Sequence, residues 1–186
     1  MTAVELAIAG NIIDFGVKNN VNVRHELKKI LAQEHLSARK RSLFHYAQFR
    51  RSLRRAGNIL YLADNAGETV FDRILIEEIR SQWPGARIEY AVKARPVIND
   101  ALAEDAYACG IDKVARVVSN GADAPGTVLP LCSREFRQKF RRADMVISKG
   151  QGNFESLSNE KRLVFFLFMV KCPVVARETG CTMGLS

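Results

Sequence analysis

Short apolar runs alternate with amphipathic stretches from residue 58 onward, and this alternation constrains the fold more than any other feature of the chain. Short apolar runs bounded by turn residues predict buried strands, and apolar residues at helical spacing between them predict helices. Strands that alternate with helices favour a mostly parallel sheet with helices on both faces. We therefore expect an α/β fold with three layers.

The pattern places each expected element along the chain. Strands are predicted at residues 59–63, 88–92, 114–118, 145–148 and 174–176. Helices are predicted at residues 69–82, 99–108, 128–142 and 159–170. Ahead of them, apolar residues recur at helical spacing within 22–36 and 41–57, which predicts a helical N-terminal segment over residues 1–57. Residues 58–186 then form the α/β part, and we expect one compact domain overall.

Composition narrows the class of protein. The chain has 186 residues, of which 47% are hydrophobic, enough for a globular core. Its longest apolar stretch, residues 163–170, is far shorter than the roughly 20 residues that cross a bilayer, so we expect no membrane partner. The four cysteines form no Cys-x-x-Cys pair. With no export signal in view, we expect reduced thiols and a cytoplasmic protein.

The formal net charge of +8 comes largely from two basic segments, residues 38–55 and 134–142. Such segments can attract nucleic acid or another polyanion. Aromatic and aliphatic residues recur within them at helical spacing, however, which favours solvated faces of ordinary helices. No zinc-finger or RNA-recognition signature is present. We therefore do not expect nucleic acid as a partner, and a basic nucleic-acid-binding module remains an alternative function.

Polar and small residues follow four successive predicted strands. These segments are DNAGE at 64–68, KARPVIND at 93–100, SNGADAPGT at 119–127 and KGQGNFE at 149–155. The carboxyl ends of parallel strands meet at one edge of a sheet, and open α/β sheets bind their ligands there. The sequence therefore predicts a functional site at this edge.

Asp64, Asn65 and Asp100 are candidate metal ligands at that edge. The two acids are separated by a spacing that fits one strand–helix–strand unit plus a loop, so both could enter one crevice. Two carboxylates and an amide oxygen suit Mg²⁺ or Mn²⁺. The three histidines all lie in the N-terminal segment, which argues against a zinc hydrolase. Turns and helix N-caps are the alternative explanation for these residues.

Lys149 and residues 119–127 are candidates for binding a phosphate. A lysine at the end of a strand can offer its ammonium to a phosphate, with a surface lysine as the alternative. Backbone N–H groups of the Gly-bearing loop 119–127 could form an anion cradle, or the segment could be a plain loop. Neither loop contains the P-loop pattern G-x-x-x-x-G-K-[ST], and no strand leads into G-x-G-x-x-G. A P-loop NTPase is therefore excluded, and a dinucleotide-binding fold is disfavoured.

Taken together, these motifs resemble those of the DUF89 family of metal-dependent damage-control phosphatases. The resemblance is carried by GNIIDFG (10–16), DNAGE (64–68), K-x-x-P-x-x-N-D (93–100), SNGADAPGT (119–127) and SKGQGNFE (148–155), in the family's order. The form of the last motif is closer to the microbial branch. The resemblance implies a three-layer α/β fold and hydrolysis of small phosphorylated metabolites, often damaged ones.

The resemblance also assigns roles to individual residues. It implies metal ligands at Asp64, Asn65 and Asp100, and contact of Lys149 with the substrate phosphate. Six further positions match the family's motifs and are predicted to line the site: Asn11, Asp14, Glu68, Lys93, Ser119 and Asp123. Relatives usually have a longer helical region before GN-x-x-D. Either a domain is missing here or this branch is compact. The motifs therefore do not determine which segment covers the substrate.

We therefore predict a metal-dependent phosphatase with Asp64 and Lys149 as catalytic residues. Its cofactor would be a divalent ion, Mn²⁺, Mg²⁺, Co²⁺ or Ni²⁺, and its partner a small phosphorylated metabolite. Asp64 or a metal-bound water could attack the phosphorus, and we favour water because Asp64 is assigned to the metal. An α/β methyltransferase is a further alternative. The sequence does not fix the exact substrate, the metal or the oligomeric state.

Overall fold

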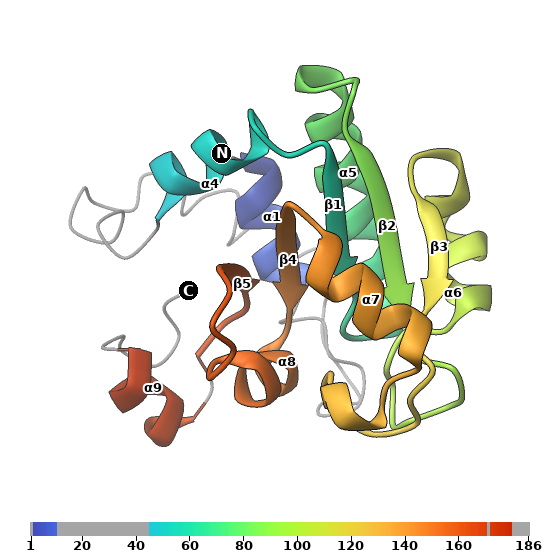
Figure 1. Cartoon of the computed structure of the whole chain (residues 1–186), viewed down its shortest axis with the longest axis vertical. Helices are drawn as coiled ribbons and strands as arrows, with labels where there is room; N and C mark the ends of the chain where they lie inside the picture. The colour runs from blue at the N-terminus through green and yellow to red at the C-terminus, as the bar shows by residue number, and fades with distance from the viewer. Residues whose placement is uncertain (1, 11–44, 171, 180–186) are drawn as a thin grey trace, which may run out of the picture.

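A five-stranded parallel sheet forms the centre of the computed structural model, which describes residues 2–10, 45–170 and 172–179 (Figure 1). The sheet has the order β3-β2-β1-β4-β5, and each neighbouring pair runs parallel. The strands are β1 (Asn58–Leu62), β2 (Arg87–Val92), β3 (Arg116–Ser119), β4 (Met145–Lys149) and β5 (Val164–Leu167). The parallel sheet confirms the predicted α/β class.

Helices cover both faces of the sheet, because alternate residues of each strand point to opposite sides. On one face, Tyr61 of β1 shares a core with Leu75 of the long helix α5. On the other face, Leu60 of β1 packs with Phe136 and Phe140 of α7. The first core also contains residues of α1, α4 and α6. The helices are α1 (Thr2–Gly10), α4 (Tyr46–Leu53), α5 (Thr69–Gln82), α6 (Ala103–Ala108), α7 (Arg134–Arg142), α8 (Gln151–Leu157) and α9 (Pro173–Thr179).

The sequence located four strands and the main helix well. The helix predicted at 69–82 coincides with α5, and β1 to β4 lie within two residues of their predicted positions. The last part was predicted wrongly, because the expected helix at 159–170 contains β5 and the expected strand at 174–176 lies inside α9. A continuous apolar run has no period that separates a strand from a buried helix.

The described part of the N-terminal segment is helical, as α1 and α4 show. The helix predicted within 22–36, together with Asn11 and Asp14, lies outside the described residues. The boundary at residue 57 between a helical segment and the α/β part stays a prediction. In the ranges that the structure describes, no helix combines the length and apolar character needed to cross a membrane.

The strand order creates a switch point between β1 and β4. β2 and β3 lie on one side of β1, whereas β4 and β5 lie on the other. The connections that leave β1 and β4 therefore lead to opposite sides of the sheet, and open α/β sheets bind their ligands at the carboxyl ends of the strands at such a point. In Figure 1 this is the lower edge of the sheet, toward which the strand arrows point.

Candidate active site

The loops after β1 and β2 bring Asp64, Asn65 and Asp100 together at this edge. Asn65 and Asp100 face each other in an isolated antiparallel bridge. The backbone N–H of Ala101 donates to the carbonyl of Asp64 at 2.8 Å. The two segments predicted from the sequence to share a crevice are thus neighbours in space, although they are far apart along the chain.

Gly150, directly after β4, lies against the Asp64 carboxylate. Its backbone has φ 80° and ψ 157°, a conformation that only glycine adopts readily. A Cβ at this position would overlap both carboxylate oxygens of Asp64. The absence of a side chain at Gly150 is therefore what allows the Asp64 carboxylate to lie at the switch point between β1 and β4.

Lys93 ties Asp100 to the loop after β3. Its ammonium lies 3.3 Å from Asp100 Oδ2 and donates to the carbonyls of Ala124, at 2.8 Å, and Gly126. The Lys93 side chain is buried. Burial raises the pKa of the Asp100 carboxyl, and the Lys93 ammonium offsets part of that rise. Lys93 thus lies beside Asp100, and these contacts favour a positioning role for it, whereas its predicted contact with substrate stays a prediction.

Two backbone N–H groups of the loop 119–127 donate hydrogen bonds to side chains of the same loop. The N–H of Gly121 donates to Ser119 Oγ at 3.0 Å, and the N–H of Ala122 donates to Asn120 Oδ1 at 2.9 Å. These two N–H groups therefore hold the turn itself, and the anion cradle, one of the two alternatives left open by the sequence, would have to use other N–H groups of the loop. Ser119 and Asp123 are exposed on this loop, so both are accessible to a ligand.

Asn153 joins the loop after β3 to the ends of β1 and β4, a role that the sequence analysis missed. Its Nδ2 donates to the carbonyls of Ala63, at 3.0 Å, and Lys149, at 2.8 Å. Its Oδ1 accepts from Thr127 Oγ1 at 2.6 Å. The residue stands in the motif SKGQGNFE, so the motif contained the signal, but nothing in its pattern indicated an inward orientation.

Lys149 is fully buried and lies between two carboxylates. Its ammonium donates to Glu68 Oε2 at 2.6 Å and to Asp72 Oδ1 at 2.8 Å. Burial lowers the pKa of Lys149, but Asp72 and Glu68 more than offset this effect, so the net pKa is raised. The surface-lysine alternative is therefore wrong. Contact of Lys149 with a substrate phosphate stays a prediction.

Asp72 was not predicted, and it anchors the inner end of this network. Tyr61 donates to its Oδ1 at 2.8 Å, and Tyr90 donates to its Oδ2 at 2.7 Å. Burial, followed by the charge of Asp72, raises the pKa of both tyrosines well above its usual value. A signal did exist, because Asp72 falls on the apolar stripe of α5 with Leu75 and Ile79, where a charge needs a partner.

The donors at this edge fit a divalent cation. Among the described residues, no three His, Cys, Asp or Glu side chains form a metal cluster, so the set depends on the amide oxygen of Asn65 beside two carboxylates. Oxygen-only sets of this kind suit Mg²⁺ and Mn²⁺. One hydrogen-bonded group, joined through Asn65, contains Asp64, Glu68, Asp72 and Lys149, and Lys93 pairs separately with Asp100. The four carboxylates outnumber the two ammonium groups, which favours a cation.

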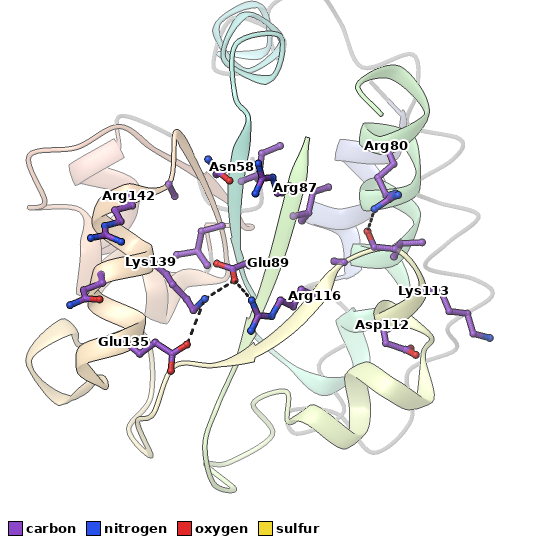
Figure 2. Close-up of a pocket in the computed structure, with 17 residues that line it drawn as sticks. Asn58, Arg80, Arg87, Glu89, Asp112, Lys113, Arg116, Glu135, Lys139 and Arg142 are labelled. Atoms are coloured by element: carbon purple, nitrogen blue, oxygen red, sulfur yellow. Dashed lines mark hydrogen bonds and ion pairs between the residues drawn. The ribbon is translucent and has the colours of Figure 1, made fainter. Parts of the chain in front are cut away.

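A separate cavity of about 830 Å³ lies at the opposite edge of the sheet (Figure 2). It is lined by residues near the amino ends of β1 and β2 and by α7. Glu89 at its centre lies 2.7 Å from the ammonium of Lys139 and 3.7 Å from the guanidinium of Arg116. None of the predicted site residues lines this cavity, so it is distinct from the crevice at Asp64.

The chain is thus an α/β protein with carboxylate and amide side chains gathered at the switch point of its sheet. A family profile described as "Damage-control phosphatase ARMT1-like domain" matches residues 1–185. The chain is 45% identical over 185 residues to a damage-control phosphatase of Pyrococcus horikoshii, covering 98% of this chain and 62% of that protein. It is 34% identical to a damage-control phosphatase of Archaeoglobus fulgidus, with the same two coverages.

The chain belongs to this ARMT1-like damage-control phosphatase domain family, since the family profile spans nearly all of it. The crystal structure of a DUF89 family protein from Pyrococcus horikoshii superposes on it with a TM-score of 0.86 at 42% identity, covering 99% of this chain and 63% of that one. The resemblance drawn from the sequence motifs is thus confirmed. The chain spans about 62% of the length of the curated relatives described above.

Proposed function

We propose that this chain is a metal-dependent phosphatase, or the catalytic part of one, that hydrolyses phosphomonoesters of small metabolites. The observation that carries the proposal is the meeting of Asp64, Asn65 and Asp100 at the switch point of the sheet. Membership of a family whose relatives are named damage-control phosphatases supports it. Membership of this family also favours a phosphatase over the two alternative functions, a methyltransferase and a nucleic-acid-binding module.

Asp64, Asn65 and Asp100 would hold a divalent cation, Mn²⁺, Mg²⁺, Co²⁺ or Ni²⁺, through their side-chain oxygens. Such a cation, when bound, polarises phosphoryl oxygens as a Lewis acid. Gly150 and Lys93 keep the two carboxylates in place, the first by close approach to Asp64 and the second through its ion pair with Asp100. Ligands that are held in position before the substrate arrives lower barriers in this way in preorganised sites.

In the proposed reaction, the oxygen of a water molecule bonds to the phosphorus and the phosphorus–oxygen bond to the metabolite breaks. One proton of that water passes to the released alkoxide oxygen, so the products are the alcohol and inorganic phosphate. We propose that Lys149 stabilises the charge on the transferring group. Its ammonium has three N–H groups, and two of them donate to Glu68 and Asp72. Because the side chain is fully buried, the site would have to open around Lys149 for its third N–H group to reach a phosphate oxygen. Ser119 and Asp123, exposed on the neighbouring loop, would contact the rest of the metabolite.

We further propose a cytoplasmic location. The three cysteines within the described residues, Cys109, Cys132 and Cys172, form no disulfide, as expected of a protein in a reducing compartment.

A phosphatase screen tests the proposed function. The purified protein is assayed against a panel of phosphorylated metabolites, with Mg²⁺, Mn²⁺, Co²⁺ or Ni²⁺ added in turn. We expect turnover that requires one of these metals and that is lost in Asp64→Ala and in Asp100→Ala, with both variants still folded by circular dichroism. Exposed Asp112 provides a matched control, since Asp112→Ala is expected to retain activity. Full turnover in both crevice variants would contradict the proposal.

A further inference from the structure

Glu68 contacts Asn65 rather than the open crevice, although the sequence placed it among the residues that line the substrate. Its side chain is fully buried, and its Oε1 accepts a hydrogen bond from Asn65 Nδ2 at 2.8 Å. The same Nδ2 also donates to Asp64 Oδ2 at 3.2 Å. The amide of Asn65 is therefore flanked on its nitrogen side by two carboxylate oxygens.

This arrangement fixes which atom of the amide can bind a cation. Ionised carboxylates accept hydrogen bonds and cannot donate them, so the amide must present its NH₂ group to Glu68 and Asp64. The amide oxygen then points away from these two acceptors and is the atom left for a metal. If Asn65 turned over, its oxygen would face two carboxylate oxygens and its NH₂ group would face the cation.

Glu68 is itself held in place. Its second oxygen, Oε2, accepts from the ammonium of Lys149, which Asp72 also binds. Asp72 in turn accepts from the hydroxyls of Tyr61 and Tyr90. All of these side chains are fully buried. A hydrogen-bonded chain thus runs from the middle of the sheet through Glu68 to the amide of Asn65.

We infer that Glu68 is a positioning residue that orients the Asn65 amide so that its oxygen, and not its nitrogen, faces the divalent cation. The inference rests on the metal site of the proposed function and adds a cause for its geometry. Residues that hydrogen-bond to a metal ligand without binding the metal commonly change metal affinity by about 10- to 100-fold when they are replaced. Glu68 would act in this way without touching the metal or the substrate.

Replacing Glu68 by glutamine makes a sharp prediction, because glutamine keeps the shape but carries an NH₂ group. The Lys149 ammonium can only donate, so it selects the oxygen of the new side chain and turns the new NH₂ group toward Asn65. Asn65 must then turn over to accept this hydrogen bond, which removes its oxygen from the cation. In an Asn65→Asp background no such conflict arises, because one oxygen of the introduced carboxylate accepts from the glutamine while the other remains for the metal.

The test is a double-mutant cycle with Mn²⁺ alone as the ligand. Mn²⁺ affinity is measured by calorimetry in the wild-type protein, E68Q, N65D and N65D/E68Q. We expect E68Q to weaken Mn²⁺ binding about 10- to 100-fold when residue 65 is asparagine. When residue 65 is aspartate we expect no weakening, because E68Q then replaces two facing carboxylates by a hydrogen-bonded pair. Loss of one negative charge alone would weaken binding in both backgrounds, so a weakening confined to the asparagine background identifies orientation as its cause. Glu160→Gln, an exposed change between α8 and β5, is expected to leave the affinity unchanged.

The outcomes of the cycle distinguish a failure of the inference about Glu68 from a failure of the proposed function. Equal effects of E68Q in both backgrounds, or no effect in either, would overturn the inference while leaving the proposed function intact. No Mn²⁺ binding by the wild-type protein would instead contradict the proposed function. If E68Q does not fold, the side-chain NH₂ signals of Asn65 in the wild-type protein, assigned by their loss in N65D, provide a second measurement. We expect slow hydrogen exchange for them with Mg²⁺ present, and exchange as fast as that of an exposed amide would overturn the inference.

Discussion

Gly150 is the single residue on which the position of the Asp64 carboxylate depends most. Gly150→Ala places a methyl group where that carboxylate lies and forces a residue with a Cβ into a glycine-only conformation. We expect the free energy of unfolding to fall by about 1–3 kcal/mol, and Mn²⁺ affinity to fall with it. Urea unfolding and calorimetry measure the two effects.

Gly85→Ala is the matched control for this change. No atom lies within 4 Å of a Cβ built at Gly85, so the substitution is expected to shift stability by less than about 0.5 kcal/mol. A Gly150→Ala protein that binds Mn²⁺ as tightly as the wild type would contradict the close approach described for Asp64.

Ile98 holds a strained backbone two residues before Asp100. It has φ 49°, a left-handed conformation that β-branched residues avoid, and its side chain is 86% exposed. Asparagine tolerates this conformation better, so Ile98→Asn is expected to raise the free energy of unfolding by about 1 kcal/mol. Urea unfolding checks this result against Val70→Asn, an exposed change on helix α5 that is expected to have little effect. A decrease in stability for Ile98→Asn would show that the strain has been assigned wrongly.

The sequence allowed us to predict that the proposed metal ligands lie together, but not which residues support them, and the reason lies in where each residue stands. Asp64 directly follows a strand, and Asp100 ends the loop that follows the next strand, so strand prediction alone brings them to one edge. Asp72 and Tyr61 lie inside elements, where their partners depend on how α5 packs on the sheet. Packing of this kind cannot be read from spacing in one chain.

Among the elements, α5 and β4 are joined through the ion pairs of Lys149. Lys149→Met removes the ammonium but leaves the Glu68 and Asp72 carboxylates buried. Breaking one side of a buried ion pair in this way is expected to lower the free energy of unfolding by about 3–5 kcal/mol, as measured by urea unfolding. Lys161→Met, on the exposed loop before β5, is expected to change it by less than about 0.5 kcal/mol. Equal stability of the two variants would contradict the described network.

β5 and α9 show where sequence patterns fail for whole elements. The apolar residues around β5 are continuous, so they fit a strand and a buried helix equally well. Pairing with β4 decides the matter, because Val146 to Lys149 align with Val164 to Leu167 in parallel register. Once these residues form an edge strand, the short segment after them is left to form α9 rather than another strand.

Alkaline pH is expected to destabilise the protein as a whole, since the pKa values of Tyr61 and Tyr90 are raised in the folded state. In the unfolded chain tyrosine loses its proton near pH 10, whereas these two keep theirs until the pH is higher. The stability they contribute is thus fully present below about pH 10 and is lost as pH rises through their folded-state pKa values. The pKa of Lys149 is also raised, so the stability that this residue contributes is likewise lost as the pH rises.

Tyr90→Phe tests this dependence. The variant is expected to be less stable at pH 8, by about 1–3 kcal/mol, because the Asp72 carboxylate loses a donor. Its free energy of unfolding should then fall less steeply between about pH 10 and 11.5 than that of the wild-type protein. Urea unfolding at a series of pH values gives both slopes. Identical slopes would contradict the raised pKa of Tyr90.

Anomalous scattering from crystals soaked in Mn²⁺ tests most directly whether Asp64, Asn65 and Asp100 hold one cation. We predict a single strong peak at the switch point of the sheet, bonded to one oxygen from each of these three side chains and absent in Asp100→Ala. Those side chains turned away from one another, with no peak between them, would contradict the account.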